Sequence, residues 1–105
     1  MAELKITKNN FEKEVLKSDL PVLLDFWATW CPPCRMLAPV VEQIAEEYEG
    51  RVKVGKVNVD EEQELAAMFR VENIPTVVVM RNGKLTDTLV GYHPKEQLEA
   101  MFHFL

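Results

Sequence analysis

The sequence predicts an α/β fold in which a central mixed sheet of five strands is flanked by four helices. Apolar residues recur at strand spacing in five short segments and at helical spacing in four others, and the two kinds of segment largely alternate. In the first half of the chain this alternation implies parallel strands joined by crossovers. Near the end, the dipeptide Asn82-Gly83 is typical of a tight hairpin, which adds antiparallel strands.

The N-terminal elements are predicted from local patterns. Residues 4–7 form a short predicted strand, and Asn9 and Glu12 have the spacing of a capping box that opens a short helix. Residues 22–28 are almost all apolar, which is typical of a central strand buried on both faces.

The best-defined helix follows this strand. Residues 37–48 place apolar side chains on one side and glutamates on the other, and Gly50 is expected to end the helix as a C-cap. Pro39 lies inside the helix and is expected to kink it, because its ring clashes with the preceding turn.

The second half continues the alternation. Gly55 is a possible bulge, and Pro94 is expected to open the last helix. Asp60 is expected to cap a helix that carries Leu65, Met68 and Phe69. The predicted strands here are residues 52–59, 76–81 and 85–90.

Composition narrows the class of protein. The 105 residues have the length of one domain, so we expect residues 1–105 to fold as a single unit, and the content of 48% hydrophobic and 28% charged residues is that of a soluble globular protein. A net charge of −5 disfavours nucleic acid and anionic membrane surfaces as partners, and the apolar runs are too short to span a bilayer. The first residues lack the apolar core of a signal peptide. We therefore expect a cytoplasmic protein, and a monomer.

Two cysteines, Cys31 and Cys34, directly follow the central strand and lie where the long helix begins. A helix N-terminus favours negative charge, so a thiolate at Cys31 is stabilised there and becomes nucleophilic near neutral pH. Cys34 lies one turn further on and can attack a mixed disulfide at Cys31. A disulfide between the two closes a very short loop, so it would add little to the stability of the fold and is not mainly structural. The pair therefore indicates thiol–disulfide exchange, with Cys31, beside Trp30, as the exposed nucleophile.

Other interpretations of the pair stay open at this point. The cysteines could bind zinc, but a structural zinc site needs four ligands. The two histidines, His93 and His103, do not have the spacing of zinc-finger ligands. They could also be buried and inert, although Trp27 and Trp30 beside them suggest a semi-exposed aromatic surface.

Residues 25–35, with the sequence DFWATWCPPCR, resemble the active-site segment of the thioredoxin family. The rest of that family's signature is matched, in the same order and spacing, by Ile74-Pro75-Thr76, Asn82-Gly83 and Val90-Gly91. The resemblance covers essentially the whole chain. It implies the thioredoxin fold and the activity of a thiol–disulfide oxidoreductase.

The resemblance also implies roles for individual residues. Cys31 matches the attacking cysteine, Cys34 the resolving cysteine, and Asp25 a buried acid behind Cys34 that exchanges its proton. Lys56 matches a lysine near that acid, and Pro75 a cis-proline that faces the cysteines. The apolar surface expected to receive the substrate peptide comprises Trp30, Pro32, Pro33, Val59, Ile74, Val90, Gly91 and Tyr92.

Each role has a structural alternative. Asp25 lies in an apolar strand, where an uncompensated charge is costly, but it could be an ordinary buried carboxylate held by hydrogen bonds. Lys56 could be a solvated strand residue, and the surface around Ile74 and Val90 could be simple core.

Two residues depart from the family pattern. Pro32 stands where the family usually has glycine, which removes a backbone N–H near the thiolate and is expected to change the reduction potential. Tyr92 is larger than the residue common at its position and is expected to reshape the choice of partner.

We therefore expect a protein disulfide reductase that binds no cofactor itself. As an electron carrier it would be re-reduced by thioredoxin reductase, to which NADPH and FAD belong. One alternative is a thiol–disulfide oxidant or isomerase of the same fold, which the missing signal segment disfavours, since oxidants work in oxidising compartments. The other is a redox-independent binding subunit, which a double Cys→Ser variant would leave active.

Overall fold

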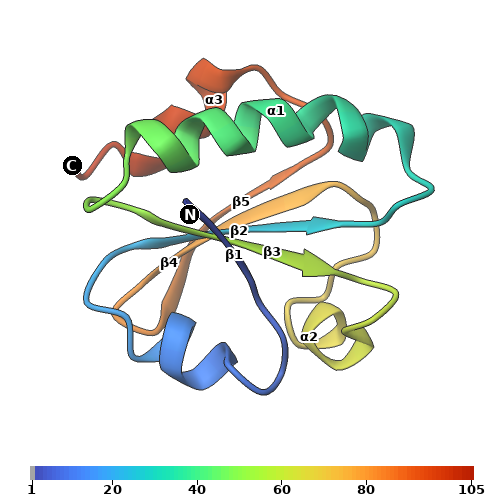
Figure 1. Cartoon of the computed structure of the whole chain (residues 1–105), viewed down its shortest axis with the longest axis horizontal. Coiled ribbons are helices and arrows are strands. Elements are labelled where there is room, and N and C mark those ends of the chain that lie inside the picture. The colour runs from blue at the N-terminus through green and yellow to red at the C-terminus, as the bar shows by residue number, and fades with distance from the viewer. Residues whose placement is uncertain (1) are drawn as a thin grey trace.

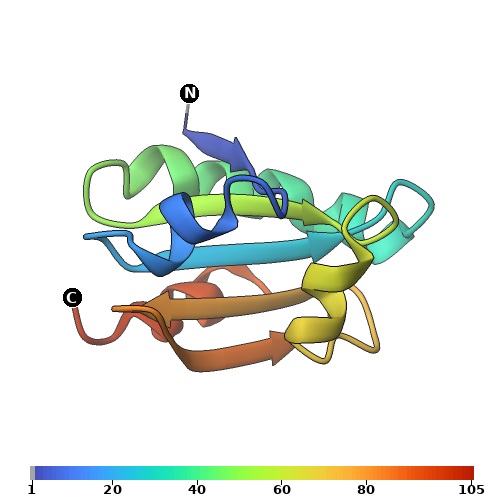
Figure 2. The ribbon, with the colours of Figure 1, turned by 90° about the horizontal axis from the view of Figure 1, so that it is seen from below.

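The central sheet has five strands in the order β1-β3-β2-β4-β5 in the computed structural model, which describes residues 2–105. The strands are β1 (Glu3–Lys5), β2 (Val22–Trp27), β3 (Lys53–Asn58), β4 (Thr76–Arg81) and β5 (Lys84–Val90). β3 runs parallel to β1 and β2, whereas β4 is antiparallel to β2 and β5 is antiparallel to β4. The mixed five-stranded sheet is therefore confirmed, and Figure 2 shows it from edge to edge.

Helical segments cover both faces of this sheet (Figure 1). On one face lie α1 (Pro32–Glu47), α3 (Lys95–Glu99) and the 3₁₀ turn η2 (Ala100–Phe102). On the other lie the π-helical turn η1 (Glu12–Leu16) and α2 (Gln63–Met68). With α3 and η2 taken as one region, these are the four predicted helices. Over residues 2–105, every helix is too short or too polar to cross a bilayer.

Two apolar clusters fill the space on the two faces of the sheet. Toward α1, Leu23 of β2 belongs to the same buried cluster as Ile44 of the helix. Toward α2, Phe26 of β2 belongs to a second cluster with Leu65. Because side chains alternate along a strand, Asp25 points to the same face as Leu23, which is the face that α1 covers. The fold thus places one carboxylate of the central strand under the long helix.

The predicted hairpin turn is confirmed. Asn82 and Gly83 connect β4 to β5 with φ values of 52° and 77°, as the two central residues of a type I′ turn require. The predicted C-cap at Gly50 is wrong, because Tyr48 is the C-cap of α1; Gly50 lies in the turn after the helix, where its φ of 86° is a conformation that glycine adopts readily. α1 itself continues through Pro39 as one helix from Pro32 to Glu47.

The predicted capping box before η1 is wrong. η1 has no side-chain cap, so Asn9 and Glu12 do not satisfy each other's backbone N–H groups. The next residue, Asn10, takes over the local hydrogen bonding, because its Oδ1 accepts from the Thr7 N–H at 2.8 Å. This bond stabilises a turn that precedes the helix rather than the helix itself.

The predicted bulge at Gly55 is also wrong. β3 passes through Gly55 in regular register with Leu24 of β2, and the irregularity of the sheet lies between Val79 and Met80. Glycine is required here for space. A Cβ at this position would lie 2.5 Å from Cγ1 of Ile6 and 3.0 Å from Cδ2 of Leu24.

Candidate active site

Cys31 and Cys34 form a disulfide at the N-terminus of α1, with their Cα atoms 5.2 Å apart. Cys31 is the N-cap residue of the helix, and its Sγ accepts a hydrogen bond from the Cys34 N–H at 3.3 Å. The two residues between them, Pro32 and Pro33, have no N–H to donate. The sulfur of Cys31 therefore occupies the position where a capping side chain satisfies the start of a helix.

The expectation that Cys31 is the more exposed cysteine is wrong, because each residue of the pair is 3% exposed. The side chains of Trp27, Val59 and Ile74 pack against the small cluster that contains both cysteines. What distinguishes the two is their position at the helix start, since the hydrogen bond runs from the backbone of Cys34 to the sulfur of Cys31.

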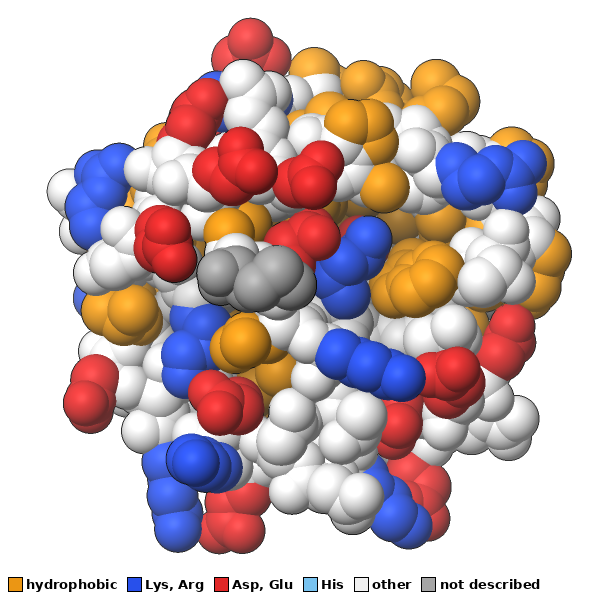
Figure 3. Space-filling model, viewed as in Figure 1, with side chains coloured by type: hydrophobic (Ala, Val, Ile, Leu, Met, Phe, Trp, Pro, Cys, Tyr) orange, Lys and Arg blue, Asp and Glu red, His pale blue; other side chains and the backbone are white. Residues whose placement is uncertain are grey.

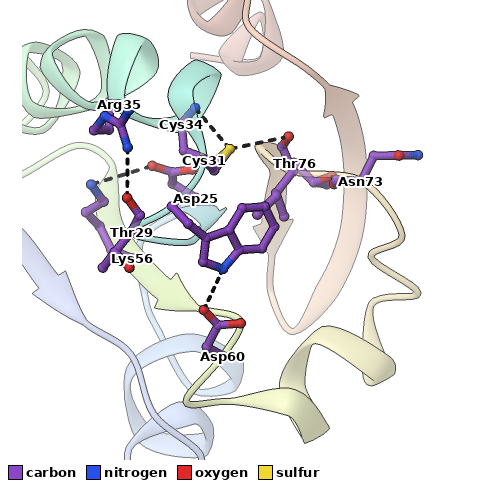
Figure 4. Close-up of a disulfide and its surroundings, with 11 residues drawn as sticks. Asp25, Thr29, Cys31, Cys34, Arg35, Lys56, Asp60, Asn73 and Thr76 are labelled. Atoms are coloured by element: carbon purple, nitrogen blue, oxygen red, sulfur yellow. Dashed lines mark hydrogen bonds and ion pairs between the residues drawn. A yellow bond between two sulfur atoms is a disulfide. The ribbon is translucent and has the colours of Figure 1, made fainter.

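Asp25 lies in β2 on the α1 side of the sheet and is 1% exposed. Figure 4 shows it together with Lys56 beneath the turn that carries the cysteines. Lys56 is its direct neighbour on β3, with Nζ 3.7 Å from Asp25 Oδ2, which is longer than a hydrogen bond. Within the part of the chain that the structure describes, neither carboxylate oxygen has a hydrogen-bond partner. The alternative of a hydrogen-bonded structural carboxylate is therefore not supported.

Burial dominates the acidity of this group. It raises the pKa of Asp25 from 3.8 to about 6 because the charged form is desolvated. The nearby ammonium of Lys56 lowers the pKa and so limits the rise, whereas the carboxylate of Glu3 adds to it. Asp25 therefore exchanges its proton much closer to neutral pH than an exposed aspartate does.

Lys56 connects this carboxylate with the surface. Its Nζ lies 5.0 Å from the centre of the Trp27 ring, and its side chain is 21% exposed. Lys56 and Trp27 line a hollow of about 480 Å³ on the face shown in Figure 3, together with Glu3, Leu4, Lys5, Thr29, Asn58 and Glu61. Lys56 therefore stands between Asp25 and solvent.

The loop that carries Pro75 lies beside the cysteines. The Ile74–Pro75 peptide bond is cis, as the resemblance implied, and the carbonyl oxygen of Ile74 lies 3.7 Å from Cys31 Sγ. Two hydrogen bonds fix the loop: Thr76 Oγ1 donates to the Asn73 carbonyl at 2.5 Å, and the Gly91 N–H donates to the Pro75 carbonyl at 2.7 Å. The loop and the end of β5 are thereby joined next to the disulfide.

The residues expected to receive a substrate differ in their exposure. Trp30, Val90 and Tyr92 are the large apolar side chains that reach solvent, with exposures of 63%, 52% and 42%. Pro32 and Pro33 are also exposed. Three members of the predicted surface are half-buried, namely Val59, Ile74 and Gly91.

Two contacts at the site were not foreseen. Asp60 does not cap α2, which has no side-chain cap; instead its Oδ2 accepts a hydrogen bond from Trp30 Nε1 at 2.8 Å (Figure 4). Arg35 Nη1 donates to the Thr29 carbonyl at 2.9 Å and so ties α1 to the loop before it. Asp60 and Trp30 are 30 residues apart, and no local pattern links them.

Comparison with known proteins agrees with this geometry. The family model for thioredoxin matches residues 2–103. The chain belongs to the thioredoxin family. It is 53% identical to a thioredoxin of Rickettsia bellii over 93 residues, which are 89% of each chain. It is 50% identical over 97 residues to thioredoxin 1 of a Nostoc species, covering 92% of this chain and 91% of the relative. A thioredoxin of Porphyra purpurea is 47% identical over 100 residues, covering 95% and 94%.

Membership of the thioredoxin family and the disulfide between Cys31 and Cys34 together establish the class of reaction. The chain is a thiol–disulfide oxidoreductase that reduces protein disulfides, and like other thioredoxins it takes its electrons from a reductase. Within residues 2–105, there is no group of three or more His, Cys, Asp or Glu side chains placed to bind a metal ion.

The raised pKa of Asp25 makes folding stability depend on pH. Above about pH 6 the folded protein holds an ionised Asp25 at a cost, and this cost disappears as the pH falls from about 6 to 3.8, the ordinary pKa of the group in the unfolded chain. One pKa unit corresponds to about 1.4 kcal/mol. We therefore expect the unfolding free energy of Asp25→Asn, relative to the parent, to rise by roughly 1–3 kcal/mol between pH 4 and pH 8.

Urea unfolding of both proteins across this pH range measures the difference, since the other titrating groups are shared. Asp19→Asn, which changes an exposed carboxyl, is the matched control and should show no such rise. A difference between Asp25→Asn and the parent that stays constant with pH would contradict the assignment.

Proposed function

We propose that the chain is a general disulfide reductase in which Cys31 is the attacking thiol and Cys34 the resolving thiol. The observation that carries this proposal is the place of Cys31 Sγ as N-cap of α1, where it accepts the N–H of Cys34. A thiolate there gains both a hydrogen bond and the favourable end of the helix dipole. Cys34 lies inside the helix and its sulfur lacks this position.

The reaction then takes two exchange steps. The Cys31 thiolate attacks one sulfur of the substrate disulfide, a mixed disulfide forms, and the other substrate sulfur leaves as a thiolate. Cys34 loses its proton and attacks Cys31 Sγ, which releases the second substrate thiolate and forms the Cys31–Cys34 disulfide seen in the structure. The substrate gains two electrons and the chain loses two.

We propose that Asp25 accepts the proton that Cys34 loses when it attacks. The carboxylate is buried on the α1 side of the sheet, has no hydrogen-bond partner among the described residues, and has a pKa of about 6. At neutral pH the carboxylate is mostly ionised and can accept a proton. Because burial raises its pKa, it binds that proton more strongly than an exposed aspartate would. Lys56, at 3.7 Å, connects it to the hollow at the surface and lets the proton return to solvent.

The helix start favours a reductase over an oxidant. A strong oxidant of this kind needs a reduced form in which the thiolate is highly stabilised. Here Pro32 and Pro33 contribute no N–H, so the first turn of α1 supplies only the N–H of Cys34 to the sulfur of Cys31. A thiolate with fewer N–H donors is less stabilised than one at a helix start without prolines. The reduced form of this pair is therefore less stable and gives up its electrons more readily.

We further propose that protein segments bind across the exposed side chains of Trp30, Val90 and Tyr92, beside the loop of Pro75. The reductant would be thioredoxin reductase, which would hold the NADPH and FAD, so that the chain needs no cofactor of its own. We place this activity in the cytoplasm, with the chain acting as a monomer.

The order of attack can be tested with two single variants. Cys34→Ser, once reduced and mixed with oxidised insulin, should accumulate a covalent adduct through Cys31, because no thiol is left to resolve it. Cys31→Ser should accumulate none. Intact-protein mass spectrometry under non-reducing conditions, with and without dithiothreitol, detects the adduct. An adduct that forms in Cys31→Ser but not in Cys34→Ser would reverse the proposed roles.

The role of Asp25 predicts which of the two steps slows in Asp25→Asn. Attack by Cys31 should keep its rate, whereas resolution by Cys34 should slow by roughly 100-fold at pH 7, as expected when a general base is removed. Quenched-flow trapping separates the two steps, since the mixed disulfide accumulates when only the second is slow. Resolution at the parent rate would mean that Asp25 is only structural.

A further inference from the structure

The segment that leads from β5 into α3 carries a side-chain bridge that neither thiol exchange nor proton transfer uses. The imidazole of His93 lies between two acceptors, with Nε2 2.9 Å from the Val90 carbonyl oxygen and Nδ1 in contact with Gln97 Oε1. Val90 ends β5, and Gln97 belongs to α3. One ring therefore joins the end of a strand to the helix that follows.

The carbonyl of Val90 lies at an open edge of the sheet. β5 is an outermost strand, so among the described residues one side of its backbone has no neighbouring strand. Val90 lies opposite Thr76 in the β4–β5 ladder, and the Gly91 N–H donates to the Pro75 carbonyl. Val90 and Thr76 are therefore a non-hydrogen-bonded pair, in which the backbone N–H and C=O of Val90 point away from β4. The Val90 carbonyl thus points outward, where an edge strand normally meets water or another chain. His93 satisfies it instead.

The bridge does not require a charged ring. Val90 offers only a carbonyl oxygen, so Nε2 of His93 must carry the proton of that bond. Nδ1 can then donate to Gln97 Oε1 when the ring is protonated, or accept from the amide of Gln97 when the ring is neutral. In both states the ring is anchored to α3, whose Leu98 is fully buried in the core.

We propose that His93 is a positioning residue for recognition of protein substrates. It fixes the segment Val90-Gly91-Tyr92 in one shape, by fastening the Val90 carbonyl to a helix that is itself anchored in the core. Val90 and Tyr92 are 52% and 42% exposed, and Gly91 is bonded to Pro75 beside the cysteines. A substrate peptide that lies across these residues therefore meets a surface ordered in advance, which lowers the cost of binding. This inference rests on the proposed substrate surface.

The substrates affected should be proteins, and not small disulfides. A polypeptide around a disulfide needs the surface of Val90 and Tyr92, whereas a small molecule such as hydroxyethyl disulfide needs only access to the sulfur of Cys31. His93→Leu removes both hydrogen bonds while keeping a side chain of similar size. His93→Gln keeps an N–H donor on a side chain of similar reach. His103→Leu is the matched control, because the one hydrogen bond that His103 makes within residues 2–105 is to the Ala100 carbonyl near the C-terminus.

The test is single-turnover oxidation of the reduced proteins, followed by tryptophan fluorescence, with oxidised insulin or hydroxyethyl disulfide as substrate. For His93→Leu we expect the insulin concentration at half-maximal rate to rise about three- to tenfold, the size expected from losing the hydrogen bond that holds the Val90 carbonyl. The maximal insulin rate and the rate with hydroxyethyl disulfide should stay within twofold of the parent. His93→Gln should recover most of the loss, and His103→Leu should match the parent.

Two results would overturn this inference while leaving the proposed function intact. One is an unchanged insulin dependence in His93→Leu. The other is an equal loss with both substrates, which would show a general effect on the cysteines. Failure of the parent protein itself to be oxidised by insulin would instead contradict the proposed function, and the inference with it.

Discussion

The burial of one carboxylate under the start of a helix is the constraint on which the site depends. Asp25 is 1% exposed, has Lys56 at 3.7 Å and finds no hydrogen-bond partner among the described residues. A protein selected for stability alone would fill this position with an apolar side chain, since an unsatisfied buried charge is costly. The arrangement makes sense if the carboxylate is needed as a proton acceptor. The neighbouring strands then have to hold it in place, and they do so through the regular pairing of β2 with β3 and β4.

Two opposite electrostatic environments meet at this point of the fold. The N-terminus of α1 favours a negative charge on Cys31, whereas the sheet beneath it disfavours a negative charge on Asp25. A proton that leaves a thiol therefore has an acceptor whose affinity for it has been raised by burial. The two prolines at the start of α1 limit the first effect, because they withhold N–H donors from the sulfur. The stability of the Cys31 thiolate in turn influences how readily the pair gives up its electrons.

Much of the fold could be predicted because its signals are local. The apolar run of β2, the helical periodicity of α1 and the Asn82-Gly83 turn each specify one element without help from the rest of the chain. The cysteine pair and the buried Asp25 were likewise visible in the sequence. The contact of Trp30 with Asp60 was not, because it joins residues from two separate loops. The equal burial of Cys31 and Cys34 depends on side chains from several elements, and the need for glycine at position 55 arises from Ile6 on the neighbouring segment.

The fold keeps the proton of Asp25 bound at pH values well above the ordinary pKa of an aspartate. Carboxyl-carbon NMR of the oxidised protein, with Asp25→Asn to assign the resonance, measures this directly in a pH titration. We expect a midpoint of about 6 for Asp25. A midpoint near 3.8, the ordinary value, would show that the carboxylate is solvated or paired in solution, and would contradict its role as a buried proton acceptor.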